Sequence, residues 1–168
     1  MNIEAKDILE YHCPRWSELP EIDLYVDQVV SILQKNLIIF AKDKENPVIT
    51  SSMINNYVKK EILLPPIKKK YNKEHLAKLF VICICKKLMS ISEIGESIKI
   101  MQKLYSVEEG YNIFCDELEK ALKHSFKCKK NENENNSEES REIATLKAIT
   151  MAFADTVLVD RLIMMRNK

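Results

Sequence analysis

The stretch that decides the fold is residues 50–94, which read TSSMINNYVKKEILLPPIKKKYNKEHLAKLFVICICKKLMSISEI. It contains three helix starts in close succession. Thr50 can cap the first helix and Asn72 the second, because their side-chain oxygens accept a hydrogen bond from the backbone of the first turn. Ser90 and Glu93 have the spacing of a capping box, which opens the third helix. Apolar residues at staple spacing flank each cap, so local chemistry alone predicts all three starts.

A double proline separates the first two helices. We expect the first helix to run towards Leu63 and to end before Pro65-Pro66, because proline lacks a backbone donor and disfavours a helical residue before it. Lys68 to Tyr71 then form a short exposed turn, and the next helix covers Asn72 to Leu88. A short helix, a basic turn, a longer helix and a tight turn into another helix form the layout of a small DNA-reading unit.

Several parts of the chain carry a family resemblance. Met53–Pro66 resembles the recognition helix and wing entry of MerR-type winged-helix regulators. Lys70–Leu79 resembles the start of their next helix and Met89–Ile94 its end. Together with Pro14–Trp16 and Leu24–Gln28, these segments are similar to a bacterial family classed as a domain of unknown function. The resemblance implies a MerR-like winged helix-turn-helix half that binds DNA, although an asparagine stands where MerR proteins carry arginine beside the recognition-helix tyrosine.

Composition and apolar spacing predict an all-α protein. The chain has 168 residues, 46% of them hydrophobic, and only two glycines. Residues 22–41 predict a long helix that is apolar on most sides, and we include it in a winged helix-turn-helix-like domain over residues 1–104. We expect a C-terminal helical bundle over residues 105–168.

The C-terminal region is expected to contain two helices joined by a loop. Ser106 and Glu109 form another capping box, which opens a helix over 107–126. Residues 127–140 are dominated by Asn, Glu, Lys and Ser, a composition typical of a mobile loop. The last helix, 141–166, is apolar around most of its surface, so we expect it to pack on the preceding helix and to meet a second subunit.

Positive charge is concentrated in the middle of the chain. Residues 50–89 contain nine lysines against two glutamates, which gives a net charge of +7 there and −6 in the remainder of the chain. The lysines are Lys59, Lys60, Lys68, Lys69, Lys70, Lys73, Lys78, Lys86 and Lys87. Such a block is typical of polyanion binding, and a solvated lysine face is the alternative interpretation.

The helix-turn-helix hypothesis assigns a set of DNA contacts. Early residues of the second helix face base edges in such a unit, and asparagine can pair bidentately with adenine, so Asn55 or Asn56 is the candidate for sequence readout. Their alternative role is that of polar residues on a helix surface. The candidate DNA-binding residues are Thr50, Ser51, Ser52, Asn55, Asn56, Lys59, Lys60, Lys68, Lys69 and Lys70.

Other classes of function find little support. Two glycines cannot build a phosphate-binding loop, and no nucleophile elbow or His-Glu zinc signature occurs, so we expect neither an enzyme nor a cofactor. Cys83 and Cys85 point apart on a helix, and His75 is interpreted as a polar first-turn residue, so no metal site is predicted. An odd number of cysteines and the lack of a signal peptide or membrane-length apolar run lead us to expect a cytoplasmic protein with no membrane contact.

We therefore expect sequence-specific duplex DNA binding in transcription regulation. A homodimer through apolar helices, including 141–166, is expected because one short recognition helix reads few base pairs. The first alternative is a helical protein-interaction or assembly module without DNA binding. The second is a sensor whose C-terminal helices bind a small apolar molecule.

Overall fold

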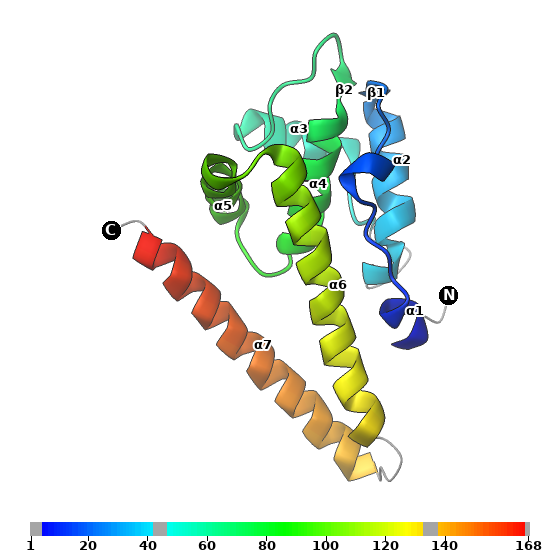
Figure 1. The fold of residues 1–168 in the computed structure, drawn as a ribbon, viewed down its shortest axis with the longest axis vertical. Coiled ribbons are helices and arrows are strands. Elements are labelled where there is room, and N and C mark those ends of the chain that lie inside the picture. The colour runs from blue at the N-terminus through cyan, green and yellow to red at the C-terminus, as the bar shows by residue number, and fades with distance from the viewer. Residues whose placement is uncertain (1–4, 42–46, 133–137, 167–168) are drawn as a thin grey trace. The chain divides into compact units, whose positions relative to one another are not determined.

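The computed structural model describes residues 5–41, 47–132 and 138–166, and it is mostly helical (Figure 1). In these ranges seven α-helices accompany two short 3₁₀ helices and a two-stranded antiparallel sheet. The elements are α1 (Ala5–Leu9), η1 (Trp16–Glu18), β1 (Leu24–Tyr25), α2 (Val26–Leu37), η2 (Ile38–Phe40), α3 (Ser51–Lys59), β2 (Lys70–Tyr71), α4 (Lys73–Cys85), α5 (Ile91–Leu104), α6 (Val107–Glu132) and α7 (Glu138–Arg166). The predicted all-α class is confirmed, with the small sheet as an addition.

The chain forms two compact units, Met1–Lys123 and His124–Lys168. The boundary thus lies later than the expected division between residues 104 and 105. The reason is a set of bonds between the N-terminal segment and α6. The Tyr111 hydroxyl donates to the carbonyl of Pro14 at 2.8 Å, and the Trp16 amide donates to the Asn112 side chain at 2.9 Å. These bonds attach the first half of α6 to the first unit.

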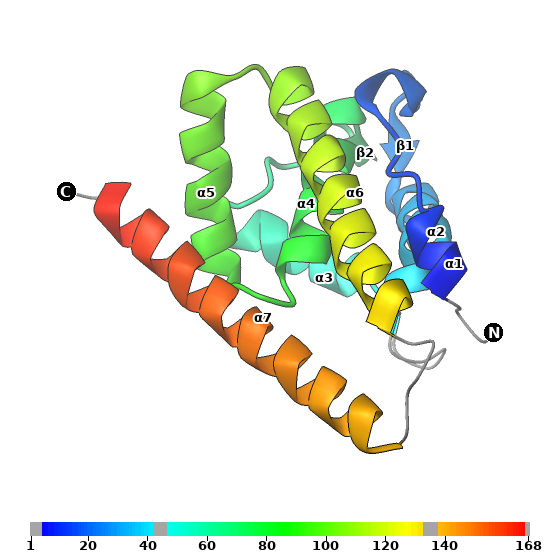
Figure 2. The ribbon, with the colours of Figure 1, turned by 60° about the horizontal axis from the view of Figure 1, so that its bottom comes forward.

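Helix α4 is the centre of the first unit's core (Figure 2). Most of its residues are buried, and it contacts both α2 and α5. The largest fully buried side chains of the core are Phe80, Leu33, Leu37, Ile49, Ile54, Leu63, Leu76, Leu79, Ile82 and Ile94. The near-continuous apolar sequence of α4 is the expected signature of a helix enclosed on several sides.

The three predicted helix starts are confirmed. The Thr50 hydroxyl accepts a hydrogen bond from the Met53 amide at 3.2 Å, and the Asn72 side chain accepts one from the His75 amide at 3.1 Å. Ser90 exchanges both capping-box bonds with Glu93. Each start is therefore fixed by contacts within a few residues, which is why the sequence alone could predict it.

Several helix boundaries differ from expectation, among them the end of α4, which lies at Cys85 and not at Leu88. α3 ends at Lys59 instead of continuing towards Leu63, because Glu61 adopts a positive φ of 57° that a right-handed helix cannot contain. The single long helix expected over 22–41 is divided in the structure. Leu24 and Tyr25 pair with Tyr71 and Lys70 as β1 and β2, α2 covers Val26–Leu37, and the 3₁₀ helix η2 follows at Ile38–Phe40. Sheet pairing therefore replaces the first helical turn.

Parts of the segment expected to be a loop over 127–140 are helical. α6 continues to Glu132 and α7 begins at Glu138, while residues 133–137 lie outside the described residues. Lysine and glutamate are good helix formers, and pairs such as Glu117–Lys120 at 2.7 Å and Glu119–Lys123 at 3.5 Å support the helix surface. Low apolar content thus did not prevent helix formation.

Candidate functional site

One face of α3 is polar and exposed to solvent. Ser52, Asn55, Asn56 and Lys59 recur at three- and four-residue steps, and all four side chains are exposed. They line a shallow hollow together with Met53. The opposite face is anchored by Ile54 and Tyr57, which are buried. The predicted contact residues of this helix are thus brought together on one open surface.

Two further predicted residues have partners in the first turn of α3. Thr50 is half-buried, and its hydroxyl is used as the helix cap. The Ser51 hydroxyl donates to the Asp27 carboxylate at 3.4 Å, which connects α3 to the first turn of α2. Both residues therefore position α3, in addition to any contact they make with a ligand.

The basic turn is a two-residue hairpin. The Ile67 amide donates to the Lys70 carbonyl at 3.0 Å, and the Lys70 amide donates back at 2.9 Å. Lys68 and Lys69 between them have φ values of 49° and 64°. Positive φ at both central residues defines a type I′ turn, in which asparagine and glycine are the preferred residues. Lysine is strained there by roughly 1 kcal/mol per residue.

Lys70 at the base of this turn packs differently from its neighbours. Its ammonium group lies 5.3 Å from the centroid of the Tyr25 ring, a cation–π contact. Tyr25 is the N-cap residue of α2, two positions before the Asp27 that Ser51 contacts. The base of the basic turn and the first turn of α3 therefore both attach to the start of α2.

His75 is a structural residue that sequence reasoning did not identify. It is buried, whereas the sequence predicted an ordinary polar residue of the first turn. Its Nε2 lies 3.1 Å from the Leu64 carbonyl oxygen, and its Nδ1 faces the Asn72 cap. Burial lowers the pKa of His75, partly offset by the bond to Leu64. The neutral ring thus holds the segment between α3 and the basic turn against α4.

Several lysines of the basic block have structural partners instead of open surroundings. Lys73 pairs with Glu21 and lies 5.1 Å from the Trp16 ring centroid. Lys86 donates to the Val48 carbonyl and Lys87 to the Phe40 carbonyl, so both close the C-terminal end of α4 against preceding loops. These three lysines therefore stabilise the fold through contacts with other parts of the chain.

Four lysines of the block lie at the end of α3 and at the hairpin tip. Lys59, Lys60, Lys68 and Lys69 are all exposed. Within the part of the chain that the structure describes, none of their ammonium groups has a hydrogen-bond or ion-pair partner. Of the nine lysines that the sequence places in residues 50–89, these four form two small groups of exposed cations that are open to a ligand.

Comparison with known proteins adds a family. The model of a family described as "Domain of unknown function (DUF1836)" matches residues 14–121. The chain belongs to this family. No curated protein and no solved structure matches the chain. The matched part of this DUF1836 protein contains every candidate site residue and ends close to the boundary of the first unit at Lys123.

The predicted membership in a domain-of-unknown-function family is thus confirmed for the DUF1836 protein. In the described ranges no helix combines the length and hydropathy needed to cross a bilayer. The MerR-like DNA binding that the sequence resemblance implies would depend on α3 as the recognition helix and on the basic turn as the wing.

Proposed function

We propose that this DUF1836 protein binds duplex DNA through a MerR-like winged helix-turn-helix and regulates transcription. In this proposal α2 and α3 form the helix-turn-helix, and α3 is the recognition helix. The hairpin formed by β2 and the Ile67–Lys70 turn is the wing. The observation that carries the proposal is the exposed polar face of α3 together with the exposed lysines at the hairpin tip.

The conformation of the tip supports a role for its lysines. A type I′ turn is most stable with asparagine and glycine, so lysine at both central positions weakens the fold locally. Backbone strain of this kind concentrates at functional sites. Cationic side chains on a projecting turn suit contacts with phosphate groups, which position a protein on duplex DNA without reading its sequence.

The face of α3 supports sequence readout. Ser52, Asn55 and Asn56 are short polar side chains on one exposed surface. An asparagine amide offers adenine a donor and an acceptor in the major groove, and such a pair discriminates by about 1–3 kcal/mol. Lys59 and Lys60 follow at the C-terminal end of the helix, where they would contact phosphates.

A homodimer completes the proposal. α3 has nine residues, so one copy reads few base pairs, and two copies would read two half-sites. α7 supplies an apolar surface for association. Large side chains along it are exposed, including Leu146, Phe153 and Leu158. Exposed apolar patches of this kind mark interaction sites, and sedimentation that shows a monomer at micromolar concentrations would contradict the dimer.

The experiment measures the affinity of the full-length protein for duplex DNA as a function of salt. A preferred sequence is first selected from a random duplex library, and binding is then followed by fluorescence anisotropy. The Lys68→Gln/Lys69→Gln variant should bind all duplexes more weakly, and its salt slope should fall by about 0.9 for each phosphate group that the variant no longer neutralises. Lys99→Gln/Lys103→Gln is the matched control, because it removes two exposed charges from α5.

The same assay tests readout by α3. Asn55→Ala and Asn56→Ala should weaken binding to the selected sequence by about 1–3 kcal/mol and leave binding to a scrambled duplex nearly unchanged. An equal decrease in affinity for both duplexes would contradict base readout by these residues. An unchanged salt slope in the double-lysine variant would remove the hairpin tip from the mechanism.

A helical assembly module without DNA binding is the second candidate function. The exposed apolar side chains of α7 favour it, because they need a protein surface to cover them whether or not DNA binds. Stable oligomers combined with no salt-dependent binding to any selected duplex would favour this alternative.

A further inference from the structure

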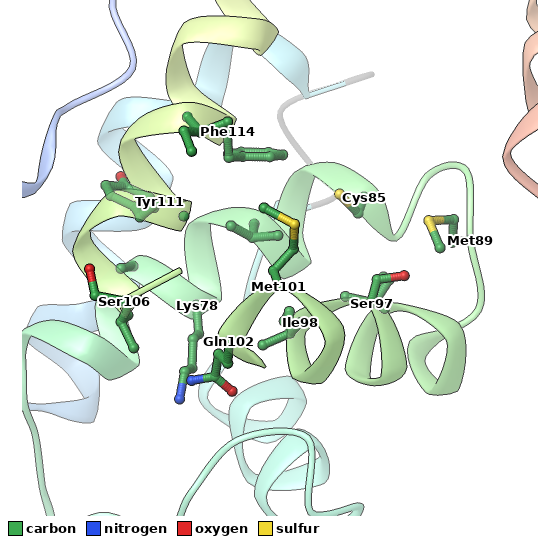
Figure 3. Close-up of a pocket in the computed structure, with 16 residues that line it drawn as sticks. Lys78, Cys85, Met89, Ser97, Ile98, Met101, Gln102, Ser106, Tyr111 and Phe114 are labelled. Atoms are coloured by element: carbon green, nitrogen blue, oxygen red, sulfur yellow. The ribbon is translucent and has the colours of Figure 1, made fainter. Parts of the chain in front are cut away.

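The first unit contains a cavity whose walls are almost entirely apolar. It lies between α4, α5 and α6, has a volume of about 270 Å³ and opens to the surface (Figure 3). Val81 and Cys85 line it from α4, Ile98 and Met101 from α5, and Tyr111 and Phe114 from α6. A hydrocarbon of about ten carbons suits a cavity of this size, which lies near the lower end of the range for ligand pockets.

The polar groups of the cavity are few and lie on its edge. Lys78 lines it and is half-buried, and Figure 3 shows the polar ends of Lys78 and Gln102 on the same side of the cavity. Among the residues described, the Lys78 ammonium group has no hydrogen-bond or ion-pair partner. Gln102 is exposed, and its amide likewise forms no hydrogen bond with a described residue.

A half-buried cation beside an apolar cavity selects a particular ligand chemistry. The apolar walls favour a hydrocarbon tail, because burying it releases water from both surfaces. The partly desolvated ammonium group favours an anion at the edge, since a charge-assisted hydrogen bond replaces the water that burial removes.

We propose that this cavity binds a small amphipathic carboxylate, a fatty acid of medium chain length. Its tail lies between Val81, Ile98 and Phe114, and its carboxylate accepts hydrogen bonds from Lys78 and Gln102. This inference goes beyond DNA binding and does not depend on it, since the residues involved are separate from α3 and the hairpin tip.

The test is direct binding of decanoate to the full-length protein, by calorimetry and by methyl NMR, below the critical micelle concentration. The comparison ligands are 1-decanol, which has the same tail without charge, and decyltrimethylammonium, which has the opposite charge. We expect decanoate to bind about tenfold more tightly than decanol, and decyltrimethylammonium to bind most weakly. Decanoate should shift the methyl resonances of Val81 and Ile98.

Two variants assign the binding to this cavity. Lys78→Gln should reduce decanoate affinity to that of decanol and leave decanol affinity unchanged, whereas Lys103→Gln, an exposed lysine outside the cavity on α5, should change neither. Ser97→Leu should weaken both ligands by filling the volume, and its circular dichroism spectrum and unfolding temperature report whether it folds. If Ser97→Leu does not fold, the comparison of Lys78→Gln with the unaltered protein still tests the proposal.

Three results would overturn the proposal. The first is equal affinity for decanoate and decanol in the unaltered protein. The second is an absence of methyl shifts at Val81 and Ile98 when decanoate is added. The third is a change of oligomeric state in Ser97→Leu without any decanoate binding to the unaltered protein, which would mean that a helix of a second copy occupies the cavity.

Discussion

Arg15 Nη1 donates a hydrogen bond to Glu119 Oε1 at 2.7 Å, and the Cys13 amide donates to the same oxygen at 3.0 Å. The pair joins the segment between α1 and η1 to the middle of α6, although 104 residues separate the two in sequence. Burial opposes ionisation of Glu119, but the bonds from Arg15 and Cys13 prevail and lower its pKa to about 2. The carboxylate therefore stabilises the attachment of α6 to the first unit.

The stability that Glu119 contributes should depend on pH. Its folded-state pKa lies below its ordinary value of 4.5, so the contribution is fully present above pH 4.5 and is lost as the pH falls towards 2. Glu119→Gln should lower the free energy of unfolding by about 1–3 kcal/mol near neutral pH, because it removes the more buried of the two carboxylates that pair with Arg15 and leaves only the exposed Asp116 at 2.9 Å. The difference between the two proteins should shrink in acid. Urea unfolding at neutral and acidic pH measures this.

A matched control is available on the same helix. Glu117 pairs with Lys120 at 2.7 Å, but both side chains are about two-thirds exposed. Glu117→Gln should change the free energy of unfolding by no more than about 0.5 kcal/mol at either pH. Equal effects of the two substitutions would contradict a special role for Glu119.

His75 should make the region between α3 and the basic turn sensitive to pH. Burial lowers its pKa below 6.5, so the folded state favours the neutral ring. The unfolded chain then binds more protons than the folded one in mild acid, and the stability contributed by His75 is lost as the pH falls below 6.5. The unfolding temperature should fall as the pH is lowered from about 7.5 to about 5.5. His75→Gln should make this fall smaller, whereas His124→Gln, which replaces an exposed histidine, should leave it unchanged.

The sequence could predict what neighbouring residues determine, and it missed what distant residues determine. The caps at Thr50, Asn72 and Ser90 act over three residues, so composition and spacing were sufficient. The burial of His75 depends on the Leu64 carbonyl, eleven positions away, and the structural use of Lys73 depends on Glu21. No periodicity reveals such pairs.

The same distinction explains the candidate site. The spacing of Ser52, Asn55 and Asn56 placed them on one helix face, and the structure exposes that face. The lysine count could not separate Lys68 and Lys69, which are unpaired at a strained turn within the described residues, from Lys86 and Lys87, which bind backbone carbonyls. Charge is a property of the sequence, but its availability is a property of the fold.

The hairpin tip should show opposite effects on stability and on DNA binding. Lys68→Asn/Lys69→Gly installs the residues that a type I′ turn prefers, so the free energy of unfolding should rise by about 1 kcal/mol. If the tip contacts phosphates as proposed, the same variant should bind duplex DNA more weakly with a shallower salt slope. Denaturant unfolding and anisotropy titrations measure the two effects on one sample. A more stable variant with unchanged DNA affinity would contradict the proposed wing.

The two glycines offer a paired test of packing around α5. A Cβ added at Gly95 would lie 3.2 Å from Ile62 Cγ1, closer than ordinary van der Waals contact, whereas one at Gly110 would meet Tyr105 Cβ at 3.9 Å. Both residues are helical, so alanine adds about 0.5–1 kcal/mol of helix propensity at each. Gly110→Ala should therefore stabilise the protein, and Gly95→Ala should be less stable than Gly110→Ala because Ile62 must shift. Ile62 follows α3, and Ile62→Ala removes the Cγ1 and Cγ2 atoms that the added Cβ would meet. Gly95→Ala should therefore be more favourable to stability in an Ile62→Ala background than in the unaltered protein, as urea unfolding of the four proteins measures. Equal stability of Gly95→Ala and Gly110→Ala would contradict close packing of α5 against the segment that leaves α3.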